Sequence, residues 1–271
     1  MKEQKVKTYL SWSGGKDSTA SVILAHKNNI KIDLIVISLP YFDKEKQIYA
    51  DHPLHIKFIF EKAIPVFESW GYKVEVVSSD KDYKYWFFKK RGNKCRNKKY
   101  NGKFYGWLLG GMCKMNGEKV NPIKRLEKSL NGSGWQSIVG IGTEETERLE
   151  RLHKRKNQIS ILEQYGYTCK MAKELCEEYG LLSPLYNMGG MRQGCFFCPN
   201  AHIEEFAKLQ KHYPELWQEL LDLNKLYQQD SSQFVSQGFK YGTSFDEIEK
   251  QVNLINNQLT LFDLIKNKKE D

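Results

Sequence analysis

The run Ser13–Ser18, which reads S-G-G-K-D-S, has residue types and a spacing that suit the binding of an anion. Alternating apolar residues over 6–12 predict a half-buried strand before it, and residues 17–29 carry the pattern of a helix after it. Two successive glycines allow a sharp turn and a close backbone approach to a ligand. The N–H groups and the dipole at a helix start attract negative charge. The run therefore predicts a phosphate-binding loop.

The side chains of this loop add to the same chemistry. Ser13 and Ser18 supply hydroxyl donors, Lys16 supplies a positive charge, and Asp17 is suited to hold Mg²⁺ through water. The spacing matches neither the G-x-x-x-x-G-K-S/T loop nor the G-x-G-x-x-G fingerprint. A strand–glycine–helix turn without a ligand is the alternative, and the complete hexapeptide in this context argues against it.

Two other polar residues are candidates for the same site. Ser38 lies at the C-terminal end of the strand predicted over 32–39, where open α/β sheets bind ligands, which predicts a contact to a nucleoside. Arg148 lies in a helical pattern that begins near Thr143 and can face a phosphate or a substrate anion. Ordinary ion pairs with the neighbouring glutamates at i,i+3 and i,i+4 explain Arg148 equally well.

The pair Cys195 and Cys198 forms a C-x-x-C half-site in which two thiolates can bind one metal ion, or alternatively form a redox pair. Cys176, one predicted helix upstream, is a candidate further ligand, although it also fits the buried face of that helix. His202 is the candidate that would complete a three-cysteine zinc site. The spacing alone does not distinguish an iron–sulfur cluster from tetrahedral zinc.

The 271 residues are 40% hydrophobic and 13% aromatic, which excludes an intrinsically disordered chain. The longest apolar run, residues 32–40, is interrupted by Asp33 and Ser38 and is far shorter than the roughly 20 residues of a membrane span. We therefore expect no membrane partner. The first residues carry no apolar export signal, so we expect a cytoplasmic protein. In that compartment six cysteines predict free thiols or metal ligands rather than a disulfide scaffold.

Positive charge is concentrated in the segment Lys81–Lys103, which holds ten Lys or Arg residues and one Asp. The formal net charge of the whole chain is +9, so the remainder is formally neutral. Aromatic residues are interleaved with the basic ones, a composition that suits phosphate neutralisation and base stacking in DNA or RNA. A solvated loop, or a flap that closes over bound phosphates, fits the same composition, and these alternatives stay open.

Strand and helix patterns alternate along the chain, which predicts an α/β fold with a mainly parallel, twisted, Rossmann-like sheet and crossover helices. The further strands are predicted at residues 32–39, 74–77 and 137–142. Residues 201–228 read as one helix. The expected organisation is a domain over 1–200 with a basic aromatic insertion or flap at 81–110 and a metal loop at 183–200, then a helical C-terminal extension over 201–271.

The hexapeptide resembles the signature of the PP-loop ATP pyrophosphatases, within the adenine nucleotide alpha-hydrolase superfamily, whose fold is the HUP type of Rossmann-like sheet. The resemblance implies that the loop binds the pyrophosphate part of ATP with Mg²⁺, and that reaction at the α-phosphate adenylates a substrate and releases pyrophosphate. It implies catalytic roles for Lys16, Asp17 and Arg148. The residues expected to bind ATP are Ser13, Gly14, Gly15, Lys16, Asp17, Ser18 and Ser38.

Three further segments resemble the phosphoadenosine phosphosulfate (PAPS) reductase branch of that superfamily. They are Cys113 with the K-x-x-P element Lys119–Pro122, the strand-end glycine with Glu and Arg in Gly140–Arg148, and the loop Ser183–Pro199 with its R-Q-G-C-F-F-C-P run. The resemblance covers roughly residues 5–202 and adds Cys113 to the metal ligands Cys176, Cys195 and Cys198. Cluster-bearing relatives favour a [4Fe–4S] cluster, with Zn²⁺ as the alternative.

Sulfonucleotide reductases of this branch use a nucleophilic cysteine near the C-terminus, in an E-C-G-x-H element. The last cysteine of this sequence is Cys198, in the C-x-x-C pair, so that nucleophile is absent. The sequence therefore predicts an ATP-using enzyme that adenylates a substrate for sulfur transfer or nucleic-acid modification. Its expected partners are a sulfur-donor protein and DNA or tRNA, the nucleic acid being bound through residues 81–103. A PAPS or APS reductase, and a metal-stabilised nucleotide- or nucleic-acid-binding module without catalysis, are the alternatives.

Overall fold

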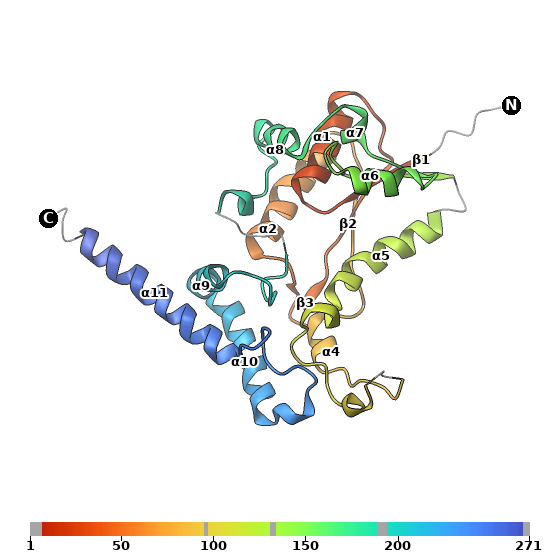
Figure 1. Cartoon of the computed structure of the whole chain (residues 1–271). Helices are drawn as coiled ribbons and strands as arrows, with labels where there is room; N and C mark the ends of the chain where they lie inside the picture. Colours follow the sequence, from red (N-terminus) through yellow and green to blue (C-terminus); the bar gives the residue numbers. More distant parts are fainter. Residues whose placement is uncertain (1–6, 95–96, 131–133, 189–193, 268–271) are drawn as a thin grey trace. The chain divides into compact units, whose positions relative to one another are not determined.

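The computed structural model describes residues 7–94, 97–130, 134–188 and 194–267 (Figure 1). The chain divides into two compact units. Unit 1 comprises Met1–Asp80 and Asn116–Gln193, and unit 2 comprises Lys81–Met115 and Gly194–Asp271. The units do not follow the predicted boundary at residue 200, because the segment 81–115 shares a core with the C-terminal residues.

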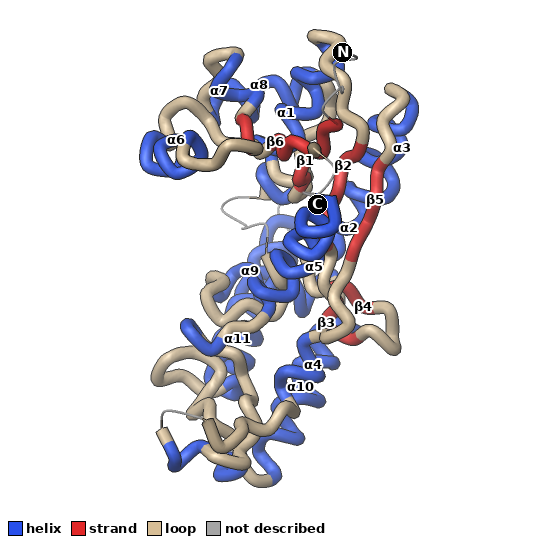
Figure 2. The backbone as a smooth tube through the Cα atoms, turned by 90° about the vertical axis from the view of Figure 1, so that its right-hand side faces the viewer, coloured by secondary structure: helices blue, strands red, loops and turns tan. Residues whose placement is uncertain are grey.

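Unit 1 is built on a five-stranded parallel sheet in the order β5-β2-β1-β6-β7, and Figure 2 shows β5, β2, β1 and β6 side by side. The strands are β1 (Lys7–Trp12), β2 (Leu34–Ser38), β5 (Val74–Val77), β6 (Trp135–Ile138) and β7 (Gln158–Ile159). Counted along the chain, this is the 3-2-1-4-5 order of a Rossmann-like sheet, so the predicted fold class is confirmed. In the central strand, Leu10 pairs with Ile35 on one side and with Ile138 on the other.

The two faces of this sheet are covered by different helices. The face that carries Leu10 and Trp12 packs against α1 (Lys16–Lys27), α7 (Ile161–Gln164), α8 (Cys169–Glu178) and a helical segment made of α2 (Pro53–Phe58), a π-helical turn (Ile59–Ala63) and α3 (Ile64–Ser69). The face that carries Tyr9 packs against α5 (Met115–Leu130). Next to it, α6 (Thr146–His153) buries Leu149 and Leu152 against Ile141.

Smaller elements complete unit 1. An antiparallel hairpin joins β3 (Tyr41–Asp43) to β4 (Ile48–Tyr49), and a 3-10 turn covers Pro184–Asn187. The strand predicted over 137–142 is β6, which lies earlier in the chain, and the helix expected near Thr143 begins at Thr146. The intervening loop contains Gly140 and Gly142, and glycine weakens both strand and helix.

Unit 2 combines the segment 81–115 with three long helices, α9 (Ile203–His212), α10 (Pro214–Gln229) and α11 (Phe245–Asn267). Its shorter elements are α4 (Tyr83–Phe87) and 3-10 turns at Lys98–Tyr100, Gly110–Met112 and Ser231–Gln233. Trp107 is buried and stacks on Phe245, with 5.3 Å between ring centroids and 8° between ring planes. Phe87 and Phe239 meet the same indole edge-on, at 5.2 and 5.0 Å.

The segment predicted as an insertion or flap is therefore part of the core of unit 2. Its backbone is tied in as well, because Phe104 N donates to Gln233 O at 2.8 Å and Val235 N donates to Phe104 O at 2.8 Å. Burial of Trp107 requires the aromatic residues that the C-terminal helices supply, which explains why the two stretches form one unit.

The helix predicted over 201–228 is two helices, α9 and α10. Pro214 is the first residue of α10, and Tyr213 before it has a non-helical φ of −139°. Proline has no N–H to continue a helix, and it disfavours the helical conformation of the residue before it. Among the described residues, no helix combines the length and the apolar character needed to cross a membrane.

Candidate nucleotide site and cysteine cluster

The loop Ser13–Ser18 joins β1 directly to α1, so the predicted strand–loop–helix arrangement is confirmed. Ser18 Oγ accepts from Ser13 N at 3.1 Å, and Ser13 Oγ accepts from Gly15 N at 3.2 Å. The two serine hydroxyls, which also lie 3.1 Å apart, therefore hold the turn of the loop in shape. Gly15 stands at the N-cap of α1 and has no side chain with which to cap the first turn, as suits a helix start that receives an anion.

Two glycines allow other parts of unit 1 to approach this loop closely. Gly14 has a φ of +75°, and a Cβ placed there would lie 2.6 Å from Cε1 and Nε2 of His55. Gly140 follows β6, and a Cβ there would lie 2.6 Å from the backbone of Asp17 and Ser18. The loop is thus enclosed on two sides by contacts that no larger residue permits.

Lys16 and Asp17 form an ion pair, with 2.6 Å between Nζ and Oδ1. Burial acts to lower the pKa of Lys16, but the hydrogen bond and the charge of Asp17 outweigh it and raise that pKa above its ordinary value. Lys16 therefore stays protonated at neutral pH and is available to bind an anion. The backbone N–H of Lys16 donates to the hydroxyl of Tyr186 at 3.1 Å.

The imidazole that packs on Gly14 belongs to a buried polar cluster. His55 is 2% exposed, its Nδ1 lies 2.9 Å from Ser183 Oγ, and it forms a hydrogen bond with the backbone of Ser13. Burial lowers the pKa of His55 below its ordinary value, against the opposing effects of Asp51 and the Ser13 backbone. Asp51 pairs with Lys119 of the K-x-x-P element at 2.5 Å. A neutral His55 thus connects the phosphate loop to Ser183.

His52 lies next to this cluster and caps α2, because its Nδ1 accepts from Leu54 N at 3.2 Å. Burial and the neighbouring His55 lower the pKa of His52 to about 4. The imidazole is therefore neutral at physiological pH, which is the form that has a nitrogen lone pair to accept the capping hydrogen bond.

Ser38 ends β2 at the carboxyl edge of the sheet, as the sequence predicts. Its hydroxyl is buried, with 8% of the residue exposed, and it has no hydrogen-bond partner among the described residues. A buried polar group without a partner is costly unless a ligand or water satisfies it. This observation is compatible with the predicted nucleoside contact.

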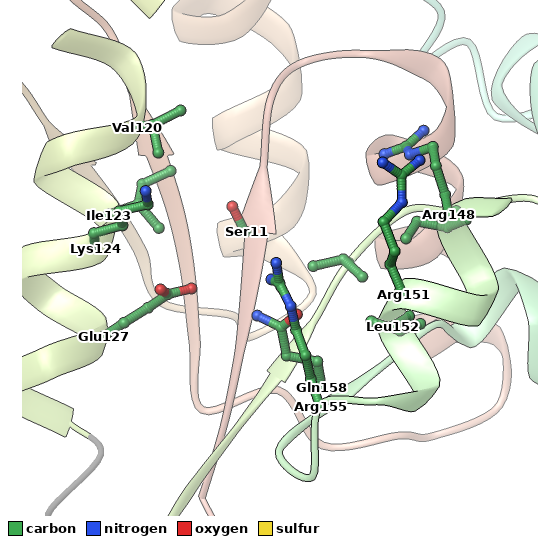
Figure 3. Close-up of a pocket in the computed structure, with 12 residues that line it drawn as sticks. Ser11, Val120, Ile123, Lys124, Glu127, Arg148, Arg151, Leu152, Arg155 and Gln158 are labelled. Carbon is green, nitrogen blue, oxygen red and sulfur yellow. The ribbon is translucent and has the colours of Figure 1, made fainter. Parts of the chain in front are cut away.

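Arg148 lines a cavity of about 500 Å³ between α5 and α6 (Figure 3). Its Nη1 donates to Glu145 Oε1, and 51% of its side chain is exposed. Arg151 and Arg155 line the same cavity, and Figure 3 shows the guanidinium groups of Arg148 and Arg151 next to each other on the α6 side. Arg148 therefore has both an ordinary ion pair within its helix and access to a cavity.

The two cysteines of α8 lie beside the phosphate loop. Cys176 is buried, and its Sγ donates to the carbonyl of Lys16 at 3.2 Å. Burial raises the pKa of the Cys176 thiol to about 12. Burial, followed by a hydrogen bond to Glu144, raises the pKa of Cys169 to about 12. Both thiols therefore remain protonated in this environment, and the predicted role of Cys176 as a metal ligand stays a prediction.

The other three predicted ligands, Cys113, Cys195 and Cys198, belong to unit 2. All three act electrostatically on Tyr83, whose pKa is raised mainly by complete burial and further by these thiols. Tyr83 packs on Phe197, with 4.1 Å between ring centroids. In the sequence, Phe197 lies between the two cysteines of the C-x-x-C pair. Within the described ranges, no three His, Cys, Asp or Glu side chains are arranged to hold a metal ion. Residues 189–193, the last two of which open the R-Q-G-C run, lie outside those ranges.

The basic aromatic segment contributes to both the core and the surface of unit 2. Tyr83 and Phe87 face inward from α4, whereas Tyr85 is 39% exposed. Lysines surround the outward rings: Lys81 lies 5.2 Å from the centroid of Trp86, and other cations lie over Tyr85, Tyr100 and Tyr105. Two of the aromatic rings of this segment are therefore buried and cannot stack on a base, and nucleic-acid binding through it stays a prediction. Residues 95–96 of the segment lie outside the described residues.

No family model matches the chain. Two proteins of Methanocaldococcus jannaschii, both described as uncharacterised, are each 24% identical to it, over 217 and 232 residues. The alignments cover 77% and 83% of this chain but only 39% and 49% of the relatives. The chain therefore spans less than half the length of the curated relatives that it matches.

Two solved structures are similar to the chain at a TM-score of 0.39. One is phosphoadenylyl-sulfate (PAPS) reductase from Candida auris in complex with phosphate, at 12% identity over 71% of this chain and 82% of that one. The other is the U34-tRNA thiolase NcsA from Methanococcus maripaludis with its [4Fe–4S] cluster, at 14% identity over 83% of this chain and 72% of that one. At these levels of similarity, the function has to be argued from the site itself.

Several residues of the site have no signal in the local sequence pattern. His55, Tyr186 and Ser183 contact the loop or its supports from positions far along the chain. Tyr186 and Ser183 lie in a segment that the sequence links to metal binding, yet both belong to unit 1. Gly140, Ser183 and Tyr186 fall in segments that carry the resemblance, but the sequence does not assign Ser183 or Tyr186 to this loop.

A substitution at Gly14 tests the packing around the loop. We expect Gly14→Ala to destabilise the protein by more than the roughly 1–2 kcal/mol of a left-handed residue, because the new Cβ overlaps the His55 ring. Gly71→Ala is the matched control, since Gly71 has a φ of +87° and its new methyl group would have no neighbour within 4 Å. Urea unfolding measures both free energies. Equal losses in the two variants would contradict the packing of His55 on Gly14.

Acid titration tests the buried histidines. A histidine whose pKa falls from 6.5 unfolded to about 4 folded stabilises the protein fully above pH 6.5, and this stability is lost as the pH falls toward 4. We expect His52→Asn, which keeps a capping side chain without titrating, to reduce the loss by up to about 1.4 kcal/mol per pH unit. Urea unfolding between pH 6.5 and 4 measures this. The exposed His212→Asn is the control, and an equal slope in both variants would rule out the assignment.

Proposed function

We propose that the chain is a PP-loop enzyme that cleaves ATP to AMP and pyrophosphate in order to adenylate a substrate, for sulfur transfer or nucleic-acid modification. The observation that carries the proposal is the geometry of the loop Ser13–Ser18. A left-handed glycine, an uncapped helix start and a protonated lysine converge there at the carboxyl end of the central strand. This is the place where open α/β sheets bind nucleotides.

In this proposal each part of the loop has a role. The side chain of Lys16 and the backbone amides of Asp17 and Ser18 bind the β- and γ-phosphates, and Asp17 holds Mg²⁺ through water. An oxygen of the substrate forms a bond to the α-phosphorus, and the bond from that phosphorus to the bridging oxygen breaks. The electron pair of the broken bond leaves with pyrophosphate, and Lys16 stabilises the negative charge that develops there. Ser38 contacts the adenosine, and Arg148 binds a substrate anion from the cavity beside β1.

In this proposal the cysteines of unit 2 are the ligands of a metal centre, although the described side chains are not arranged to hold a metal ion in this structure. Cys113, Cys195 and Cys198 all act electrostatically on the same buried tyrosine, Tyr83, and thiolates are the ligands of iron–sulfur clusters and of structural zinc. Three ligands on a [4Fe–4S] cluster would leave one iron open to hold sulfide for transfer. Cys176 is the predicted fourth ligand. The outward rings and lysines of residues 81–103 are proposed to contact DNA or tRNA, and the setting is proposed to be cytoplasmic.

The reaction is tested with the purified chain, ATP labelled at the α-phosphate, and tRNA, single-stranded DNA or a sulfur donor as acceptor. We expect AMP and pyrophosphate, and a fall of about 100-fold or more in Lys16→Ala, since Lys16 stabilises charge that develops in the transition state. Lys27→Ala, an exposed lysine of the same helix, is the control. ATP binding without pyrophosphate release would favour a binding module, and sulfite release from PAPS with thioredoxin would favour a reductase.

The metal centre is tested on protein purified without oxygen. We expect thiolate-bound iron, with a broad absorption band at about 400 nm, that Cys113→Ala, Cys195→Ala and Cys198→Ala each diminish. Cys176→Ala asks whether a fourth ligand comes from α8, and Cys169→Ala in the same helix is the control. Colourless protein that contains zinc would exclude the cluster.

A further inference from the structure

The face of the sheet that carries Tyr9 and Ser11 is only partly covered. The cavity of about 500 Å³ between α5 and α6 adjoins a second hollow of about 240 Å³, and the two share Glu127, Arg155 and Gln158. The two adjoining hollows are together named the α5–α6 groove. It lies over β1 and β6, from Ser11 at one end to Trp135 at the other.

One wall of this groove carries three arginines. Arg148 and Arg151 are three residues apart and lie on the same side of α6, and Arg155 follows in the turn after the helix, next to Gln158 (Figure 3). The glutamates of α6 do not line the groove, and the side chain of Glu147 is 91% exposed. The arginines of α6 therefore face the groove, and its glutamates do not.

The groove as a whole is strongly cationic. Its basic residues are Lys124, Arg148, Arg151, Arg155 and Lys156, and Glu127 supplies the one carboxylate among the described residues that line it. Glu127 already accepts a hydrogen bond from Tyr9 OH at 2.7 Å. The guanidinium groups have donors left for a ligand, because a guanidinium has five N–H groups and Arg155 donates one to Gln158 at 3.0 Å.

The floor of the groove is apolar and partly aromatic. Val139 and Ile141 lie beside the arginines, and Ile123 faces them from α5. At the other end Trp135 is partly exposed and packs on the buried Tyr9, with 6.5 Å between ring centroids, so Trp135 supplies the aromatic surface there. Arginines along a rim and apolar or aromatic surface beneath them are the features of sites that bind single-stranded nucleic acid, where the phosphates pair with cations and the bases stack.

We propose that the α5–α6 groove binds a single strand of nucleic acid, with its phosphates along the arginines of α6 and its bases over the floor formed by β1 and β6. The elongated form favours a strand over a free nucleotide, because the cations extend past the larger cavity to Lys156 in the second hollow. This inference goes beyond the proposed function and does not require that ATP is cleaved. It also concerns unit 1, not the basic aromatic segment of unit 2.

The experiment measures the binding of labelled single strands to the full chain by fluorescence anisotropy. The probes are RNA and DNA oligonucleotides of about 12 nucleotides, within the site sizes of roughly 4–16 nucleotides known for single-strand-binding domains. The groove variant is Arg151→Glu with Arg155→Glu. The matched control is Arg125→Glu with Lys154→Glu, which makes the same change of charge at exposed positions of α5 and beside α6 that do not line the groove.

We expect the groove variant to weaken binding more than about tenfold and to reduce the slope of log Kd against log salt by about 1.4, which is about 0.7 for each of the two phosphates that it no longer neutralises. The control variant should change binding several-fold less. Weaker binding of both the RNA and the DNA oligonucleotide to the groove variant supports the proposal. Tighter binding of one of them to the unaltered chain identifies the kind of strand. Equal weakening by both variants, no weakening by either, or equally tight binding of a mononucleotide would overturn it. Lys16→Ala should leave strand binding unchanged, so failure of ATP cleavage and failure of this inference are distinguishable.

Discussion

The close approach of three chain segments at the phosphate loop is the constraint on which the rest of unit 1 depends. Gly14 admits the ring of His55, and Gly140 admits the backbone at the start of α1. Each contact requires the absence of a Cβ, and Gly14 also requires a φ that other residues rarely adopt. The loop is therefore held in shape by packing from α2 and from the end of β6. Such rigidity suits a site that must present amides to an anion without reorganising.

Electrostatics follow from the same packing. Lys16 keeps its proton because Asp17 lies beside it, and His55 stays neutral because it is buried against the loop. The loop therefore keeps the positive charge of Lys16, while the imidazole that packs on Gly14 is neutral. The arginines of α6 are more exposed, and their ion pairs with neighbouring glutamates are of the weak surface kind. Little free energy is therefore lost when they turn to another anion.

Unit 2 shows how an aromatic core can join distant stretches of a chain. Trp107 needs Phe239 and Phe245 around it to be buried, and the backbone of Phe104 pairs with the segment before Val235. Tyr83 is buried in the same unit, within electrostatic range of Cys113, Cys195 and Cys198. The core that stabilises unit 2 thus also contains the tyrosine on which these three cysteines act, although the described side chains are not arranged to hold a metal ion.

The sequence by itself determined the features that depend on local order along the chain. The strand, the glycine pair and the helix start that form the phosphate loop are consecutive, so their pattern is readable without a structure. The alternation of strands and helices likewise predicts the parallel sheet. The apolar pattern wrongly predicted one helix over 201–228, because Pro214 divides this stretch into α9 and α10.

Only the tertiary structure decided which distant residues share a site. His55 packs on Gly14, and Tyr186 accepts from the backbone of Lys16, although both lie far along the chain from the loop and no local periodicity encodes such contacts. The α6 arginines read in sequence as ordinary surface pairs, and they line a groove only because α5 and α6 leave part of the sheet uncovered. The division into two units has the same origin. Burial of large aromatic side chains is a property of the folded chain, and it joined residues 81–115 to the C-terminal helices.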